Sequence, residues 1–93
     1  MTSPLTDTKT NTEIYDETIK RITTLIGLYT ADTGRRPTRI YMNTRTRLAL
    51  NTIFREKVIV VVPDGLRRRE TVCGCYVMVC DDLPDCEIDL GWT

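Results

Sequence analysis

The 93 residues of this chain are enough for one domain and too few for two hydrophobic cores. The composition is 41% hydrophobic and 28% charged, which excludes a collagen-like or a wholly disordered chain. The sequence contains no histidine and therefore lacks the most common general base and the most common metal ligand of proteins. We expect a protein that is not an enzyme and that uses no cofactor.

The net charge of zero hides an uneven distribution of charges along the chain. Residues 35–69 contain ten basic and two acidic residues, whereas residues 70–93 contain six acidic residues and no basic one. Three interpretations fit this asymmetry: solvated faces with internal ion pairs, a basic face that meets the acidic face of a neighbouring copy, and nucleic-acid binding.

Apolar segments are short throughout the sequence. The longest aliphatic run, residues 58–62, is far below the roughly 20 residues that span a bilayer. The first residues show neither the basic nor the apolar segment of a signal peptide. We expect no membrane contact and a protein that is not secreted through a signal peptide.

The first third of the chain predicts an extended arm followed by an amphipathic helix. Residues 1–12 are rich in threonine and poor in apolar side chains, so we expect an arm that lies along a partner. A helix is expected over residues 13–31, where apolar residues recur at helical spacing, with Asn11 or Thr12 as its cap. Gly34 is a natural C-terminal stop for this helix.

The rest of the chain predicts strands and one short helix. The run from Val58 to Val62 has no polar interruption and is typical of a strand buried on both faces. A turn is expected at Pro63-Asp64-Gly65. The other expected elements are a strand at 38–42, a helix at 44–54 capped by Asn43 or Thr44, and strands at 57–62, 70–80 and 86–90.

These elements predict an α+β fold, with residues 13–93 as a single domain. A small, largely antiparallel sheet is packed by one long N-terminal helix and one short helix. The apolar face of the long helix, which includes Ile19, Ile22, Leu25 and Ile26, is expected to lie against the 58–62 strand.

Four cysteines raise the question of a metal site: Cys73, Cys75, Cys80 and Cys86. In one continuous strand, Cys73 and Cys75 point to one face and Cys80 to the other, so no single ion reaches all three. We expect no metal, and free thiols that act as small apolar side chains. One disulfide or a zinc site are the alternatives.

The candidate binding residues are arginines in two clusters. One cluster flanks the first strand, and the other follows the Pro-Asp-Gly turn, from which its side chains are expected to project into solvent. Convergent arginines could bind phosphates, but the few aromatic residues show no pattern of a base-stacking platform. We expect these arginines to contact an acidic protein surface: Arg35, Arg36, Arg39, Arg67, Arg68 and Arg69.

Several short motifs resemble those of a known family. A strand ends in Met42-Asn43 before a short helix, a later segment reads GCYVMVCDDLP, and a last strand ends at Gly91. Together with the amphipathic helix, these motifs in residues 13–92 resemble the spine-helix to C-terminal portion of the major capsid proteins of tailed bacteriophages with the HK97-type fold. The chain is a much shortened form, without room for the extended loop and long arm of that family.

The resemblance implies a phage- or prophage-derived protein, located in the host cytoplasm or the virion, and assigns no catalytic residue. We expect a non-enzymatic structural or assembly protein, a minor or auxiliary capsid component, that acts through contacts with a protein partner or with itself. The alternatives are a small phage inhibitor that binds a host defence protein and a basic nucleic-acid-binding module. No small-molecule substrate is expected.

Overall fold

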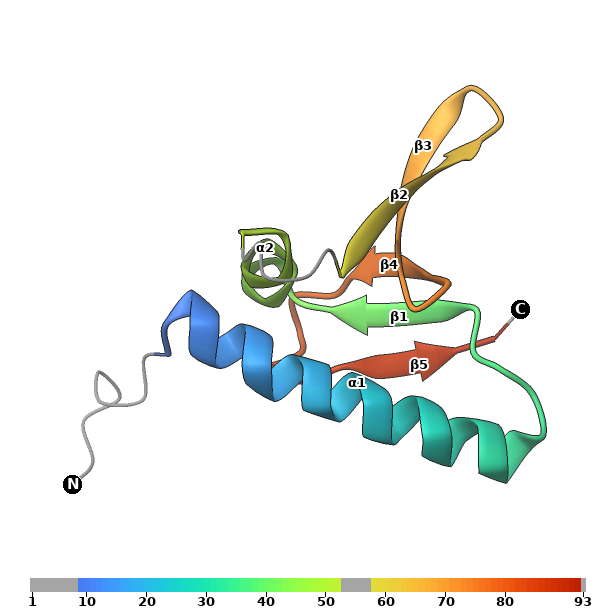
Figure 1. Cartoon of the computed structure of the whole chain (residues 1–93), viewed down its shortest axis with the longest axis horizontal. Helices are drawn as coiled ribbons and strands as arrows, with labels where there is room; N and C mark the ends of the chain where they lie inside the picture. Colours follow the sequence, from blue (N-terminus) through green and yellow to red (C-terminus); the bar gives the residue numbers. More distant parts are fainter. Residues whose placement is uncertain (1–8, 53–57, 93) are drawn as a thin grey trace.

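The computed structural model describes residues 9–52 and 58–92, which fold as two helices and five strands (Figure 1). The expected α+β class is confirmed. Residues 1–8 of the expected arm lie outside the described residues. The elements in chain order are α1 (Asn11–Thr33), β1 (Arg39–Met42), α2 (Thr44–Thr52), β2 (Ile59–Asp64), β3 (Arg67–Val72), β4 (Cys75–Val79) and β5 (Asp89–Gly91).

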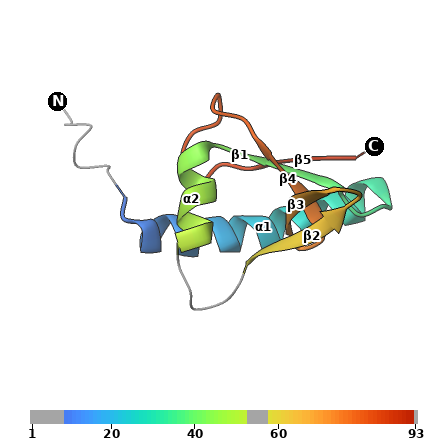
Figure 2. The same ribbon diagram turned by 90° about the horizontal axis from the view of Figure 1, so that it is seen from above.

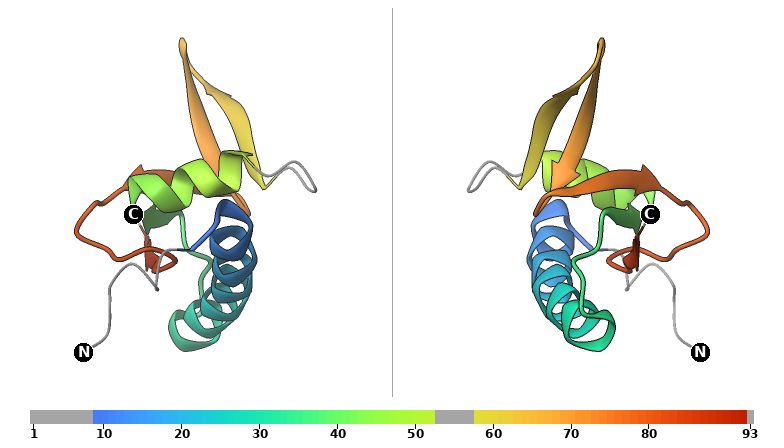
Figure 3. Two further views of the ribbon diagram at one scale, coloured as in Figure 1. Left: turned by 90° about the vertical axis from the view of Figure 1, so that its left-hand side faces the viewer. Right: turned by 90° about the vertical axis from the view of Figure 1, so that its right-hand side faces the viewer.

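The strands form one mixed sheet in the order β2-β3-β4-β1-β5. β1 pairs in parallel with β4, and the other neighbours pair antiparallel, so the sheet is largely antiparallel as predicted. Both helices lie on the same side of this sheet (Figures 2 and 3). The strand order makes β2 and β5 the two edge strands of the sheet. β2 belongs to a long hairpin, and β5 lies beside α1 (Figure 1).

α1 begins two residues earlier than the predicted helix because Thr10 is its cap. The hydroxyl of Thr10 accepts a hydrogen bond from the Glu13 N–H at 3.2 Å, and the Glu13 carboxylate accepts one from the Thr10 N–H at 3.1 Å. This capping box satisfies two N–H groups at the helix start. Gly34 ends the helix as predicted, with a left-handed φ of 74° and its N–H bonded to the carbonyl of Thr30.

Asn43 joins β1, α2 and the segment before β5. Its side-chain oxygen accepts a hydrogen bond from the Thr46 N–H at 2.7 Å and so caps α2, as expected. Its amide nitrogen donates to the carbonyl of Leu83 and to Asp85. The side chain is 8% exposed, so it makes its hydrogen bonds inside the protein.

The core lies between the helices and the covered face of the sheet. Tyr15 and Ile22 of α1 pack with Leu50 of α2 and with the inward side chains of the strands. α1 packs mainly on α2 and beside β5. Of the run 58–62, only Val58 and Ile59 belong to or pack on the core cluster of Ile22, so the expected contact of the helix with this run is limited to its first two residues. The buried core residues of the strands and the segment before β5 are Ile40, Met42, Ile59, Val72, Cys75 and Ile88.

β2 is not buried on both faces, in contrast to the prediction. Val60 and Val61 are 48% and 52% exposed, and only Ile59 in this strand belongs to the buried core. The reason is its place in the sheet, because β2 is an edge strand in a hairpin that extends away from the helices (Figure 1). An apolar run identifies a strand but not its neighbours.

The predicted strand over residues 70–80 is two strands joined by a tight turn. Cys73 and Gly74 both have positive φ, 52° and 82°, and Val72 pairs with Cys75 on either side of them. Two central residues with positive φ are typical of a type I′ hairpin turn. Cys73 therefore lies in a turn and not in a strand, so the assumed alternation of the cysteines was wrong.

Candidate interaction surface

The β2–β3 hairpin projects from the body of the protein. β2 pairs with β3 over six residues, from Ile59 to Asp64, whereas β3 pairs with β4 only at Thr71 and Val72. The outer part of the hairpin therefore has no further strand beside β3 and no helix over it (Figure 3). A two-stranded hairpin of this kind gains little stability by itself in water.

The hairpin tip presents an apolar side chain between charged ones. The connection is Gly65-Leu66, two residues after the expected start of the turn, since Pro63 and Asp64 belong to β2. Gly65 has a φ of 63°, the positive value that a type II′ turn requires at its first central residue. Leu66 is fully exposed, and Arg67 and Arg68 follow it, both exposed.

Arg69 differs from its two neighbours in the sequence. Its guanidinium lies over the ring of Tyr76 at 4.1 Å, with an ion pair to Asp64 at 3.6 Å and a contact to the sulfur of Met78 at 3.7 Å. The expectation that all three arginines project into solvent is therefore wrong for Arg69. Its side chain ties the hairpin to β4.

The other predicted arginines lie at a second place, where α1 ends and β1 begins. Arg35 lies over the Trp92 ring at 4.1 Å, and Arg36 donates a hydrogen bond to the carbonyl of Cys73 at 3.4 Å. Arg39 is half-buried at the start of β1. These three arginines lie near the start of β1, whereas Arg67 and Arg68 lie at the outer end of the hairpin. The six arginines therefore do not form one cluster.

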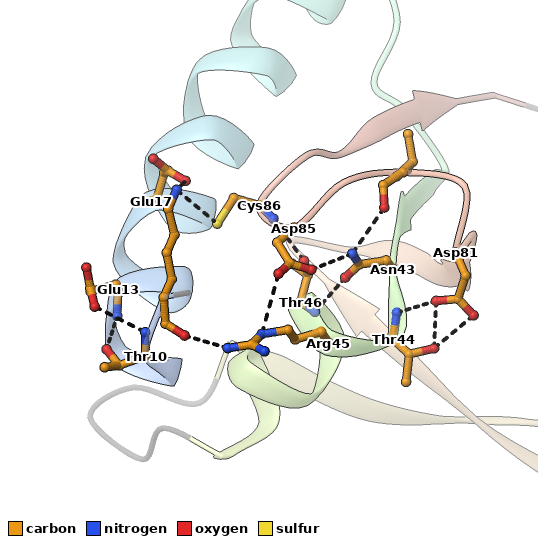
Figure 4. A network of polar contacts seen from close by, with 12 residues as sticks. Thr10, Glu13, Glu17, Asn43, Thr44, Arg45, Thr46, Asp81, Asp85 and Cys86 are labelled. Carbon is orange, nitrogen blue, oxygen red and sulfur yellow. Dashed lines mark hydrogen bonds and ion pairs between the residues drawn. The ribbon is translucent and has the colours of Figure 1, made fainter. Parts of the chain in front are cut away.

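Internal contacts account for most of the acidic C-terminal segment (Figure 4). Asp81 accepts hydrogen bonds from the N–H and the hydroxyl of Thr44, both at 2.8 Å, which lowers the pKa of its carboxyl below the usual value. Asp85 pairs with Arg45 at 3.5 Å. Glu87 pairs with Arg21 at 3.0 Å. The expected acidic face is therefore smaller than the sequence implies.

The two arginines at the hairpin tip differ from these acidic residues. Within residues 9–52 and 58–92, no carboxylate forms an ion pair with the guanidinium of Arg67 or Arg68. Arg47 contrasts with them, because it holds Glu70 in a two-contact ion pair at 2.6 and 2.7 Å that raises the pKa of Arg47. Within the described residues, the tip therefore carries two arginines without an ion-pair partner beside an exposed leucine, while the nearby Asp64 carboxylate pairs with Arg69.

The cysteines are free thiols in different environments. Cys73 is exposed in its turn, Cys80 is half-buried, and Cys75 and Cys86 are buried. Burial raises the pKa of both buried thiols, and for Cys86 the hydrogen bond to Glu17 adds to this. Both thiols fill buried positions, as expected of small side chains, but each also makes a polar contact: Cys75 donates to the carbonyl of Pro37 at 3.4 Å, and Cys86 bonds to Glu17.

Lys9, Glu17 and Cys86 form a small polar cluster at the start of α1 (Figure 4). The Lys9 ammonium contacts the Glu17 carboxylate at 2.6 Å and the Cys86 sulfur at 4.0 Å. Hydrogen bonds from the Cys86 thiol, the larger effect, and from Lys9 lower the pKa of Glu17 below its usual value. This cluster joins α1 to the segment before β5. In the part of the chain that the structure describes, no three His, Cys, Asp or Glu side chains are placed to hold a metal ion.

A groove between α1 and β5 was not recognised from the sequence. It has a volume of about 410 Å³, and Leu28 in its wall is 61% exposed. The sequence signal for the groove is a row of residues on one side of the helix, spaced i, i+3, i+4 and i+7: Leu25, Leu28, Tyr29 and Asp32. The lining residues are Leu25, Leu28, Tyr29 and Asp32 of α1 with Ile88, Asp89 and Leu90.

The sheet face opposite the helices carries two tyrosines. Arg39 pairs with Tyr76 and Tyr41 with Met78, so these four side chains share one face of β1 and β4. Arg69 already covers the ring of Tyr76. The ring of Tyr41 lies so close to Gly91 that an added Cβ would be 3.2 Å from it. These intramolecular contacts occupy one side of each ring.

The fold and this surface together define a small α+β protein with a projecting basic hairpin and an acidic apolar groove. No protein-family model, no curated protein and no solved structure matches the chain. The resemblance to HK97-type capsid proteins therefore stays a prediction from sequence motifs. Neither of the two described helices is long and apolar enough to cross a membrane.

Proposed function

We propose that this chain is a non-enzymatic binding protein whose β2–β3 hairpin contacts other protein subunits. The observation that carries the proposal is the hairpin tip, where a fully exposed Leu66 is followed by two arginines with no carboxylate partner in the described residues. Exposed apolar side chains beside arginine are typical of protein interfaces, where aliphatic anchors are desolvated and arginine is enriched.

The hairpin shape also favours a binding role. Val60 and Val61 in β2 are also half-exposed and, as successive strand residues, place one apolar side chain on each face of the hairpin. Exposed apolar residues on an edge strand favour pairing or packing with another chain. Pro63 has no N–H and limits how far an added strand could pair along β2, so side-chain contacts dominate near the tip.

The resemblance to HK97-type capsid proteins makes the proposal more specific. We propose that the partner is a subunit of a phage particle or of its assembly pathway, and that the chain is a minor or auxiliary structural component. An inhibitor of a host defence protein uses the same kind of surface, so the identity of the bound protein separates these two roles.

The test is affinity purification of the tagged chain from cells that make it naturally. Three forms are compared: the wild type, the tip variant L66S/R67S/R68S, and the control variant K20S, which changes an exposed lysine of α1 outside the hairpin. All three should melt alike, because exposed side chains contribute little to folding.

We expect one protein to co-purify in stoichiometric amounts with the wild type and with K20S and to be lost with the tip variant. Added salt should weaken the interaction, since the tip is cationic. Retention of that protein by the tip variant would contradict the proposal. Release of the partner by nuclease would show instead that nucleic acid mediates binding.

A further inference from the structure

The hairpin tip and the α1–β5 groove lie at opposite edges of the molecule. The strand order places β2 at one edge of the sheet and β5 at the other, with three strands between them. Figure 1 shows the hairpin extending upward while α1 and β5 lie at the lower side. The tip of one chain therefore cannot reach the groove of the same chain, and contact between the two requires a second copy.

The groove carries negative charge, which complements the positive charge of the tip. Asp32 lies in its helical wall, and Asp89 lies in its strand wall. Among the described side chains, no Lys or Arg forms an ion pair with either aspartate. The floor and walls between them are supplied by leucine, isoleucine and tyrosine. The groove is therefore an apolar depression with a carboxylate on each side.

The end of α1 adds to this negative potential. The last turn of the helix contains no basic residue, although the carbonyl end of a helix dipole favours cations. Asp32 lies in that last turn, where its negative charge is unfavourable. Arg35 is close in sequence but lies over Trp92. A cation from another molecule would improve the electrostatics of this helix end.

We infer that the hairpin tip of one copy docks into the α1–β5 groove of a second copy. Leu66 fills the apolar depression beside Leu25 and Leu28, while Arg67 and Arg68 meet Asp32 and Asp89. Successive residues of a strand point to opposite sides, so the two arginines reach opposite walls of the groove. This inference deepens the proposed function, on which it rests, by naming the partner as the chain itself.

The contact is head-to-tail because the two surfaces are different and lie at opposite edges. Such an interface leaves a free tip on one copy and a free groove on the other, so it continues into an open chain or closes into a ring. The protein should therefore form species larger than a dimer as its concentration rises, and high salt should dissociate them.

The test uses charge reversal on each side of the contact. The tip variant R67E/R68E and the groove variant D32R/D89R are prepared together with two controls, K20E and D82R, which reverse exposed charges elsewhere. Thermal melts verify that every variant is folded. Mass is measured by sedimentation velocity over a range of concentrations at low and high salt.

We expect the wild type and both controls to show a rise in mass with concentration, and each double variant alone to remain a monomer. An equimolar mixture of the two double variants should recover the rise. Its acidic tips meet the new basic grooves, and its basic tips meet the native acidic grooves.

Three results would overturn the inference: a wild type that is monomeric at every concentration, a mixture that fails to recover, or a control that is as disruptive as the double variants. If the wild type is monomeric while the tip still captures a different protein from its source cells, self-docking is wrong and the proposed function stands. A foreign basic partner for the groove would then be revealed by binding that D32R/D89R abolishes.

Discussion

At the scale of single residues, neighbours in the sequence have different roles. Arg67 and Arg68 are exposed beyond the last contact of the hairpin with the body, whereas Arg69 packs on Tyr76 and pairs with Asp64. From the sequence, the three consecutive arginines were expected to behave alike, because the sequence does not show which of them lies over the ring of Tyr76. The partner of Arg69 comes from β4, and only the strand pairing brings the two together.

We predict that Arg69→Ser lowers the free energy of unfolding by about 1 kcal/mol, through loss of a cation–π contact and an exposed ion pair. Arg68→Ser should change it by less than about 0.5 kcal/mol, as is usual for a surface substitution. Arg69→Lys should recover only part of the loss because lysine keeps the charge but not the flat stacking group. Urea unfolding followed by circular dichroism measures all three.

Equal stability of the Arg68 and Arg69 variants would show that the contact with Tyr76 contributes nothing to folding. The matched pair is informative because both residues belong to the same strand and differ in their surroundings.

The sequence itself contains local signals for where the helices begin and end. Thr10 and Glu13 have the spacing of a capping box, which identifies the start of α1 correctly. Gly34 and Asn43 were recognised as cap residues because their role depends on nearby backbone groups alone. Interactions within a few residues are predictable in this way, whereas the bonds of Asn43 to residues 83 and 85 depend on the fold.

At the scale of elements, the predictions failed where a strand's neighbours mattered. The run of valines in β2 is apolar enough for a core strand, yet it forms one side of a projecting hairpin. The break between β3 and β4 was missed because cysteine is an unusual residue for a turn position with positive φ. The groove was missed for a related reason, since it needs both the row of α1 residues that line it and the edge strand β5.

We predict that Cys73→Asn stabilises the protein by about 0.5–1 kcal/mol. Residue 73 has a left-handed backbone, which costs most residues about 1–2 kcal/mol and which asparagine tolerates better. Asn followed by Gly is also the preferred sequence for this type of turn. The side chain is exposed, so no core packing is lost. Thermal and urea unfolding measure the gain.

Cys80→Asn is the control for this prediction, because Cys80 is half-buried and its φ is not positive. It should not stabilise the protein. A Cys73→Asn variant no more stable than the wild type would argue against a left-handed conformation at residue 73.

At the scale of the whole molecule, the zero net charge conceals two surfaces of opposite sign. Internal pairs neutralise much of the acidic segment, since Asp81, Asp85 and Glu87 are all occupied by partners within the chain. Among the charges without an ion pair in the described residues are Arg67 and Arg68 at one edge of the sheet and Asp32 and Asp89 in the groove at the other. The sequence predicted a separation of charge along the chain, and the fold determines which of those charges are available.

The most direct test of this account is an NMR titration of the isotope-labelled chain with increasing amounts of the unlabelled chain, followed by backbone amide shifts. The account predicts shifts and broadening at residues 65–68 of the tip and at residues 25–32 and 88–90 of the groove, with Arg36 and Asp82 unchanged. Shifts confined to the sheet face around Tyr41 and Tyr76, or no shifts at any concentration, would contradict docking of the tip into the groove.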